Sequence, residues 1–155
     1  MRIIGGNLKG KKILYLKTIK TRPLKDMVRE SIFNVIFHSQ LINVQVKDSR
    51  ILDVYSGVGS FGIECISREA KNVTFVENDK SALETLEKNF FQLSINSKSI
   101  LFNQKIDLFL KQLNPNNKFD IIFFDPPFAE NRYTDELKKI HKLKAYNKNH
   151  LIIIH

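Results

Sequence analysis

Residues 51–62 read Ile-Leu-Asp-Val-Tyr-Ser-Gly-Val-Gly-Ser-Phe-Gly, and this stretch decides the fold. An apolar run carries an acid, Asp53, and leads into a glycine turn, after which a helical pattern starts. This order predicts a strand, a tight turn and a helix start, which is the geometry of a nucleotide-type cofactor site in an α/β sheet. Gly57, Gly59 and Gly62 also fit the pattern G-x-G-x-x-G, which by itself does not identify the cofactor.

Strand and helix patterns alternate from Arg50 onward. The strand-like runs are residues 51–55, 72–77, 99–102, 119–124 and 151–154. Helical patterns fill the intervals between them, at residues 61–68, 106–113 and 133–143, and also directly after Asp79. Asp79 can cap this last helix, whose apolar face consists of Leu83, Leu86, Phe90 and Leu93. Such alternation predicts right-handed βαβ crossovers and a parallel sheet with helices on both faces. We expect one domain over residues 1–155, with its cofactor-binding and catalytic core in residues 50–155.

The first 42 residues predict a small β-hairpin followed by a helix. Arg2-Ile-Ile and Lys12–Leu16 read as short strands around a glycine-containing turn. Thr21-Arg-Pro suits the start of a helix, because proline is tolerated in the first turn. The apolar residues of this helix recur at helical spacing and predict its buried face: Leu24, Val28, Ile32, Val35 and Ile36. The basic residues Arg22, Lys25 and Arg29 are predicted to lie off that face.

The positive charge is concentrated at the start of the chain. The net charge is +9, with 25 Lys and Arg against 16 Asp and Glu. Residues 1–30 hold nine basic and two acidic residues, a net of +7, which leaves +2 for residues 31–155. A basic arm attracts polyanions, and this polarity favours nucleic acid over a simple solvated surface. The predicted nucleic-acid contacts are Arg2, Lys9, Lys11, Lys12, Arg22 and Arg29.

The remaining composition predicts a cytoplasmic protein that does not engage a membrane. A single cysteine, Cys65, excludes a disulfide framework, and no apolar run is long enough to span a bilayer. The N-terminus lacks the apolar region of a signal peptide. Cys65 falls inside a helix and is expected to be a buried thiol rather than a nucleophile. The four histidines lack metal-ligand spacing, so we predict no metal, and we expect a monomer.

Acids follow three of the predicted strands, where a ligand binds in open parallel sheets. They are Asp53, Glu77 and Asp125. Glu77 lies 20 residues after Gly57, a spacing that places a carboxylate on ribose hydroxyls. Asp53 beside the glycine turn would repel a dinucleotide pyrophosphate, whereas it would stabilise the ammonium and sulfonium of S-adenosylmethionine. The alternative is that Asp53 only caps the following turn.

Asp125-Pro-Pro-Phe predicts the reaction. The Asp125 side chain and the Pro126 carbonyl can each accept one N–H of an exocyclic amine, which turns the nitrogen lone pair towards a methyl donor. Pro127 fixes this geometry and Phe128 can stack on an unstacked or flipped base. We therefore predict catalytic roles for Asp125, Pro126, Pro127 and Phe128.

Several segments together resemble the bacterial RsmD-type methyltransferases of small-subunit ribosomal RNA. They are Arg2-Ile-Ile-Gly-Gly with Gly10, Thr21-Arg-Pro, Val28-Arg-Glu, Ile32-Phe-Asn, Leu52-Asp-Val-Tyr-Ser-Gly-Val-Gly with Gly62 and Glu64, and Phe123-Phe-Asp-Pro-Pro-Phe. The resemblance implies an α/β fold with a Rossmann-like class I methyltransferase sheet, and an N-terminal arm that helps to engage RNA. It implies S-adenosyl-L-methionine as cofactor. We predict cofactor contacts at Asp53, Tyr55, Gly57, Gly59, Glu77, Asn78 and Asp107.

The chain departs from the family pattern in three places. Tyr55-Ser56 replaces the usual Phe-Ala, and Lys105-Ile106 stands where the family often has Asp-Ala in contact with adenine, so the nearby acid Asp107 is assigned that contact. The family sheet is mostly parallel and ends in an antiparallel pair after the fifth strand, where this sequence ends. An exposed sheet edge is therefore expected, unless another element covers it.

The family's reaction is methyl transfer to the exocyclic N2 of a guanine, here in 16S ribosomal RNA or a 30S assembly particle. Two alternatives stay open from the sequence. Asp-Pro-Pro-Phe also suits an adenine-N6 methyltransferase acting on DNA or RNA, because both targets present an aromatic amine. A shortened sheet would also fit a non-catalytic RNA-binding domain. A nicotinamide oxidoreductase ranks last, because Asp53 opposes the pyrophosphate.

Overall fold

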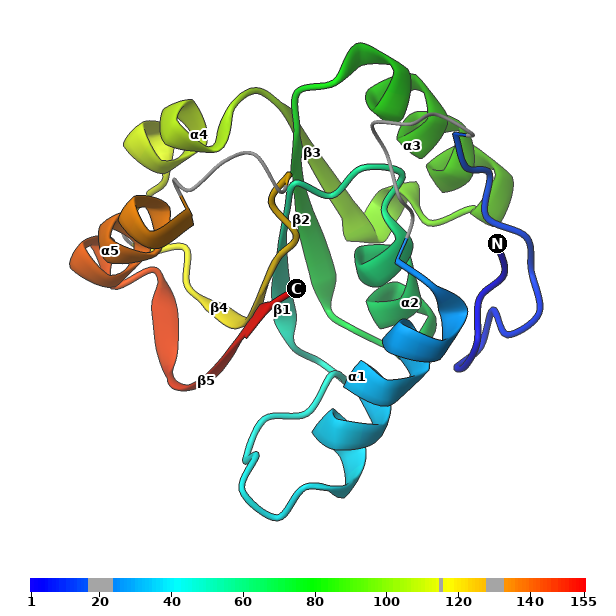
Figure 1. The fold of residues 1–155 in the computed structure, drawn as a ribbon, viewed down its shortest axis with the longest axis horizontal. Coiled ribbons are helices and arrows are strands. Elements are labelled where there is room, and N and C mark those ends of the chain that lie inside the picture. Colours follow the sequence, from blue (N-terminus) through cyan, green and yellow to red (C-terminus); the bar gives the residue numbers. More distant parts are fainter. Residues whose placement is uncertain (17–23, 115, 128–132) are drawn as a thin grey trace.

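A five-stranded parallel sheet forms the centre of the computed structural model, which describes residues 1–16, 24–114, 116–127 and 133–155. The strand order is β3-β2-β1-β4-β5, and every neighbouring pair is parallel (Figure 1). The strands are β1 (Arg50–Val54), β2 (Asn72–Glu77), β3 (Ser99–Asn103), β4 (Phe119–Phe124) and β5 (Tyr146–Ile154). The order reverses between β1 and β4, and this switch point is where open α/β sheets bind ligands.

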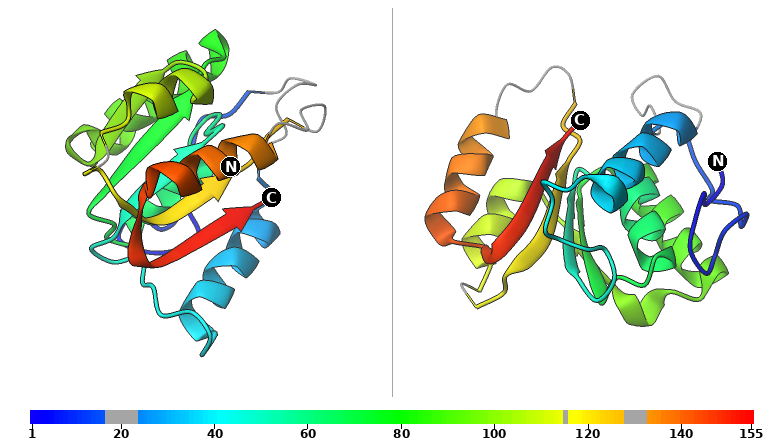
Figure 2. Two further views of the ribbon diagram at one scale, coloured as in Figure 1. Left: turned by 90° about the vertical axis from the view of Figure 1, so that its left-hand side faces the viewer. Right: turned by 90° about the horizontal axis from the view of Figure 1, so that it is seen from below.

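Helices cover both faces of the sheet, as the alternating pattern predicts. They are α1 (Asp26–His38), α2 (Ser60–Ser67), α3 (Lys80–Leu93), α4 (Ile106–Gln112) and α5 (Tyr133–Leu143), with a 3-10 turn, η1, at Asn96–Lys98. Figures 1 and 2 show α1, α2 and α3 on one side and α4 and α5 on the other. Two apolar cores follow from this arrangement. Ile51 and Phe75 pack on the first side, and Leu52 and Val76 on the second.

The predicted elements agree well with the structure where hydrophobic periodicity is strong. The bounds of β2, β4 and α5 are those predicted, and Asp79 caps α3 by accepting a hydrogen bond from the Ala82 N–H at 2.9 Å. The apolar face predicted for α3 is buried. β5 starts five residues earlier than predicted, at Tyr146, which pairs with Phe119 of β4 before the register shifts and regular pairing resumes at Leu151; side-chain patterns do not show this early pairing.

The edge of the sheet at β5 is partly exposed. Leu151 and Ile153 pack against the core, whereas Ile152 and Ile154 are 37% and 49% exposed. Among the described residues, no further strand pairs with β5. No helix in the described part of the chain is long and apolar enough to cross a membrane.

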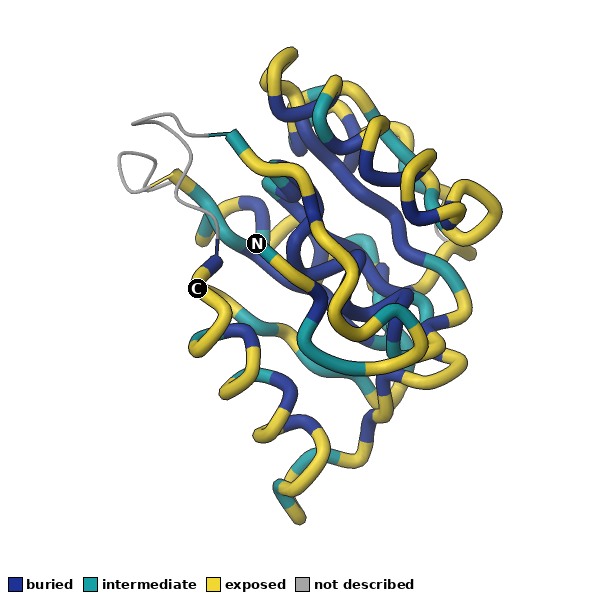
Figure 3. Tube along the Cα trace, turned by 90° about the vertical axis from the view of Figure 1, so that its right-hand side faces the viewer, coloured by how far each residue is buried: buried dark blue, intermediate teal, exposed yellow. Residues whose placement is uncertain are grey.

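The N-terminal segment pairs with itself less extensively than predicted. One antiparallel bridge joins Arg2 to Lys12, and the Ile3 N–H donates to the Lys11 carbonyl at 2.9 Å. The hairpin is thus a single bridge rather than a ladder of two strands. Ile3 and Ile13 are buried and attach the segment to the core, while Figure 3 shows the segment on the outside of the molecule.

The buried face of α1 differs from the prediction, and Arg29 is the clearest correction. Val35 is 57% exposed, whereas Arg29 and Phe33 are buried with Ile36. The helix starts at Asp26, and the predicted start at Thr21-Arg-Pro lies outside the described residues. With Arg29 fully buried, its guanidinium faces the protein and does not contact nucleic acid.

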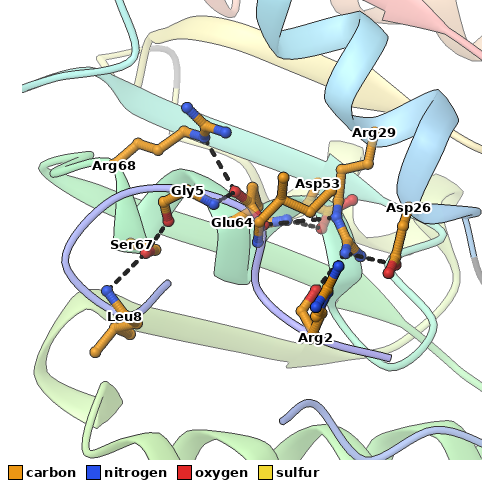
Figure 4. Close-up of polar contacts among 11 residues, drawn as sticks. Arg2, Gly5, Leu8, Asp26, Arg29, Asp53, Glu64, Ser67 and Arg68 are labelled. Atoms are coloured by element: carbon orange, nitrogen blue, oxygen red, sulfur yellow. Dashed lines mark hydrogen bonds and ion pairs between the residues drawn. The ribbon is translucent and has the colours of Figure 1, made fainter. Parts of the chain in front are cut away.

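Arg29 is buried because acids and a carbonyl surround its guanidinium. Its Nη2 lies 2.9 Å from Asp26 Oδ1 and also donates to the Arg2 carbonyl, and its Nε lies 3.5 Å from Glu64 Oε2 (Figure 4). Burial lowers the pKa of Arg29, while the charges of Glu64 and Asp26 oppose that shift. Ion pairing of this kind is what makes a buried arginine tolerable.

Glu64 on α2 is the centre of this cluster. Its carboxylate accepts the Ile4 N–H at 2.9 Å and the Gly5 N–H at 2.7 Å, and it pairs with Arg68 Nε at 3.1 Å. The Glu64 side chain is fully buried. It therefore joins the N-terminal segment and α1 to the helix that follows the glycine turn.

We predict that Glu64→Gln lowers the free energy of unfolding by about 3 kcal/mol, because the change removes the charge that pairs with buried Arg29. Urea denaturation followed by circular dichroism measures the loss. Glu69→Gln is the matched control, since Glu69 makes an exposed ion pair with Lys47 at 3.2 Å and its loss should change stability far less than the loss of Glu64. Equal losses in the two variants would contradict a buried, coupled cluster.

Candidate active site

The turn between β1 and α2 is built for close approach of a ligand. Gly57 and Gly59 have φ of +53° and +83°, a region that favours glycine. A Cβ on Gly57 would meet no atom within 4 Å, so the turn borders open space there. In contrast, a Cβ on Gly62 would lie 2.3 Å from Phe75 Cε1, so this glycine lets α2 pack closely on β2. Gly57 therefore leaves space for a ligand beside the turn, whereas Gly62 allows close packing of helix on strand.

Asp53 lies at the centre of this region and is buried. Its Oδ2 accepts the Gly62 N–H at 2.9 Å, in the first turn of α2. Burial raises the pKa of Asp53 from 3.8 to about 8, the Gly62 hydrogen bond opposes that rise, and the charges of Asp125 and Glu77 add to it. The contact with Gly62 is the turn-capping role that the sequence left as an alternative. Contact between Asp53 and a cofactor stays a prediction.

Glu77 closes the other side of the turn. Its Oε2 accepts the Gly57 N–H at 2.7 Å, and its Oε1 accepts the N–H groups of Asn78 and Asp79 at 2.7 and 2.8 Å. Glu77 is only 9% exposed, so three backbone donors compensate for its lost solvation. A carboxylate oxygen has two lone pairs, and Oε2 accepts the Gly57 N–H within the described protein. Glu77 therefore has acceptor capacity beside the open space at Gly57.

Tyr55 and Ser56 form the first part of the turn. Tyr55 has a φ of +59°, which is costly for a bulky residue and is found mainly at functional sites. Its hydroxyl donates to Glu136 Oε1 on α5 at 2.7 Å. Ser56 Oγ is buried and finds no hydrogen-bond partner among the described residues. The turn therefore offers a hydroxyl and an acceptor that a polar ligand can bind.

Asp125 follows β4 at the same edge of the sheet. Val54 pairs with Val76 and with Phe124, so Glu77 and Asp125 lie one residue beyond these partners, on either side of β1. Asp125 is 30% exposed at its side chain, and its Oδ1 lies 3.0 Å from His155 Nδ1. Pro126 and Pro127 follow it towards the surface. Phe128, the fourth residue of the predicted motif, lies outside the described residues.

The two remaining predicted cofactor residues lie near the edge of the site. Asn78 is exposed directly after Glu77. Asp107 lies in the first turn of α4, and its Oδ1 is 2.6 Å from Lys139 Nζ on α5. The carboxylate is thus held by a cation of the neighbouring helix. Its predicted contact with adenine stays a prediction.

The predicted nucleic-acid residues divide into three groups. Arg2, Lys9, Lys11 and Lys12 are exposed on the N-terminal segment. Arg29 is buried, as described above, and Arg22 lies outside the described residues. The exposed cations surround one loop, so the basic arm keeps a concentrated charge without Arg29.

Sequence reasoning missed three buried polar residues that hold the site together: Glu64, Asn89 and Glu136. A pattern signal existed for each of them. Glu64 is flanked by apolar residues on α2, Asn89 lies three residues after Leu86 on the buried face of α3, and Glu136 is four residues before buried Ile140. Polar residues at apolar positions of a helix are the ones that tertiary contacts must satisfy.

Cys65 is buried in α2, as predicted. Burial and the nearby charges of Asp53 and Glu64 raise its pKa well above the ordinary value, so the thiolate form is disfavoured. A thiol in this state is a poor nucleophile. Chemistry through a cysteine adduct is therefore not supported at this position.

These residues fit S-adenosylmethionine better than a dinucleotide. Three acids converge on the turn, and the charges of two of them act on the pKa of Asp53. A pyrophosphate would meet repulsion there, whereas a sulfonium and an ammonium would be attracted. Glu77 can accept ribose hydroxyl groups, and the open space beside Gly57 admits a ligand against the backbone. When bound, this cofactor supplies an electrophilic methyl group.

Comparisons with known proteins agree with this geometry. The family model described as conserved hypothetical protein 95 matches residues 1–155. Ribosomal RNA small subunit methyltransferase D of Haemophilus influenzae is 39% identical over 132 residues, which cover 84% of this chain and 65% of the relative. The Buchnera aphidicola protein of the same name, from the Acyrthosiphon pisum subspecies, is 35% identical over 98% of this chain and 75% of the relative.

A solved Haemophilus influenzae structure has the same fold. It superposes with a TM-score of 0.72 at 34% identity, covering 95% of this chain and 75% of that one. The chain thus spans about two thirds to three quarters of the length of these proteins. The sheet is the Rossmann-like sheet of class I methyltransferases, in five parallel strands.

We predict that Asp53→Asn removes a pH dependence from stability. Between about pH 4 and about pH 8 the folded protein keeps the Asp53 proton that the unfolded chain has lost, so the free energy of unfolding falls as pH rises. The amide oxygen can still accept the Gly62 N–H. Relative to wild type, the variant should gain up to about 4 kcal/mol between about pH 5 and about pH 8. Urea denaturation at a series of pH values measures this, and parallel stability curves for the two proteins would contradict the buried, protonated carboxyl.

Proposed function

Because this chain belongs to the family of RsmD-type ribosomal RNA methyltransferases, we propose that it methylates the exocyclic N2 of a guanine in 16S ribosomal RNA, with S-adenosyl-L-methionine as methyl donor. One observation carries the proposal. Asp53, Glu77 and Asp125 meet at the switch point of the sheet, beside a glycine turn that borders open space. This combination suits a cationic methyl donor beside the glycine turn and a methyl-accepting amine beside Asp125.

In this proposal Asp125 and Pro126 orient the target amine. The Asp125 carboxylate and the Pro126 carbonyl each accept one N–H, and the amine lone pair is then directed at the methyl group. Pro127 limits the backbone freedom after Asp125, which keeps both acceptors in place. Asp125 does not need to be a strong base, because the amine proton becomes acidic only when the nitrogen has formed its bond to carbon. The partial exposure of Asp125 gives a substrate access.

Glu77 and the turn after Tyr55 hold the cofactor in this proposal. Glu77 accepts ribose hydroxyls with the oxygen that also binds the Gly57 N–H. Ser56 Oγ offers a hydrogen bond that the described protein does not use. Asp53 ionises when the cationic donor binds, because a nearby positive charge lowers the pKa of a carboxyl.

The substrate assay uses 30S subunits from cells that lack the modification, with digestion of the RNA and mass spectrometry of its nucleosides. We expect N2-methylguanosine as the product. N6-methyladenosine would instead assign the adenine alternative. Binding of RNA without binding of S-adenosylmethionine in calorimetry would contradict an enzyme and favour a non-catalytic domain.

We predict that Asp125→Ala lowers kcat by about a hundredfold or more, because one of the two amine acceptors is lost. The dissociation constant of S-adenosylmethionine should change by less than about threefold, since Asp125 orients the amine rather than the cofactor. Single-turnover methyl transfer and calorimetry measure the two quantities.

Asp120→Ala is the matched control for this experiment. Asp120 lies on the same strand at the opposite end of the sheet, where it accepts the Arg50 N–H at 2.8 Å. This variant should keep kcat within about threefold when the folded fraction is equal. An Asp125→Ala protein that is folded and transfers methyl groups at the wild-type rate would disprove the assigned role.

A further inference from the structure

A hollow of about 500 Å³ lies beside the N-terminal segment, and none of the cofactor contacts described above uses it. Arg2, Lys12, Tyr15 and Asp26 are among the residues that line it. Tyr15 is 42% exposed although Ile13, two residues earlier, is buried, so an aromatic residue is available at the surface. The volume falls in the range of small-molecule sites, and it suits one nucleotide.

The charge of this hollow is positive because its acid is already paired. Asp26 Oδ1 lies 2.9 Å from Arg29 Nη2, and Arg29 is fully buried behind it. Arg2 and Lys12 are both exposed on the antiparallel bridge that joins them. The two surface cations therefore act on an anion without opposition from Asp26. Arg29 supports this surface indirectly, because it pairs with Asp26 and donates a hydrogen bond to the Arg2 carbonyl (Figure 4).

The backbone of the hollow is fixed to the cofactor turn through Asn89. The buried Asn89 side chain accepts the Leu14 N–H at 2.8 Å and donates to the carbonyls of Leu14 and Val58, both at 3.1 Å. Val58 lies between the two turn glycines, so the chain before Tyr15 is tied to the cofactor loop. The start of α1, which contributes Asp26, is on the side of the molecule where β4 and β5 end (Figure 2).

We propose that this hollow binds one unpaired nucleotide of the RNA substrate next to the target base. The base stacks on Tyr15, and its phosphates pair with Arg2 and Lys12. Aromatic rings and cations together are how proteins hold single-stranded nucleic acid without reading its sequence. The inference rests on the proposed function, because it takes RNA as the substrate.

A second hollow nearby provides the contrast. It measures about 590 Å³ and exposes Phe91, which is 82% accessible, but Glu84 and Glu87 line it with only Lys88 as a cation. Its net charge of −1 repels a phosphate, since two acids oppose one base. An aromatic residue alone therefore does not select RNA, and Phe91 supplies a matched control.

The first test measures RNA affinity with a fluorescein-labelled, mixed-sequence 12-nucleotide single-stranded RNA, in the presence of S-adenosylhomocysteine. Tyr15→Leu should weaken binding about tenfold, whereas Tyr15→Phe should stay within about twofold of wild type. Phe91→Leu should also stay within about twofold. Arg2→Gln combined with Lys12→Gln should reduce the magnitude of the slope of log affinity against log salt by about 1.4, because two contacts to single-strand phosphates are lost. Wild-type affinity in Tyr15→Leu, or an equal loss in Phe91→Leu, would overturn the proposal.

The second test does not depend on any variant folding. RNA that carries 5-iodouridine is irradiated with the wild-type protein, and mass spectrometry locates the crosslinked residue. We expect Tyr15, and crosslinks confined to other residues would overturn the proposal. Methyl transfer by the wild-type protein is followed in parallel. Its complete failure would count against the proposed function, whereas normal transfer with no role for Tyr15 would reject this inference alone.

Discussion

A buried carboxylate, that of Glu64, connects the parts of this molecule that are distant in sequence. It accepts two backbone N–H groups of the N-terminal segment and pairs with Arg29 of α1 and with Arg68. Isolated charges in a protein interior are costly, so each of these partners is held where it compensates the others. The position of the basic segment therefore depends on α2, the helix that begins at the glycine turn.

The candidate site also depends on how its buried carboxyl groups are compensated. Asp53, Glu77 and Asp125 meet at one edge of the sheet because parallel strands end together there. Backbone N–H groups stabilise Glu77, while Asp53 has one such donor and its pKa is raised. A cationic ligand relieves the repulsion that remains, and this is the physical basis for preferring a sulfonium donor to a pyrophosphate. Asn89 links this turn to the N-terminal segment, so the proposed cofactor and RNA surfaces belong to one connected structure.

Prediction from sequence succeeded where a short-range pattern determines the outcome. The alternation of strands and helices gave the parallel sheet, and the bounds of β2, β4 and α5 follow from apolar periodicity. It failed for Arg29, because a basic residue in a charged segment gives no sign of the acids that surround it in space. It also missed the start of β5, where Tyr146 pairs with Phe119 of β4 ahead of an irregular register that no side-chain pattern shows.

The sequence by itself determined the order of elements, the glycine turn and the three acids at strand ends, since each depends on neighbours a few residues away. Only the tertiary structure decided which charges are buried and which are exposed. Packing brought Glu64 of α2 against Arg29 of α1, which also pairs with Asp26 three residues earlier on the same helix, and it left Arg2 and Lys12 at the surface. The stretch at residues 51–62 thus predicted the kind of site, while long-range packing buries Asp53 and thereby raises its pKa.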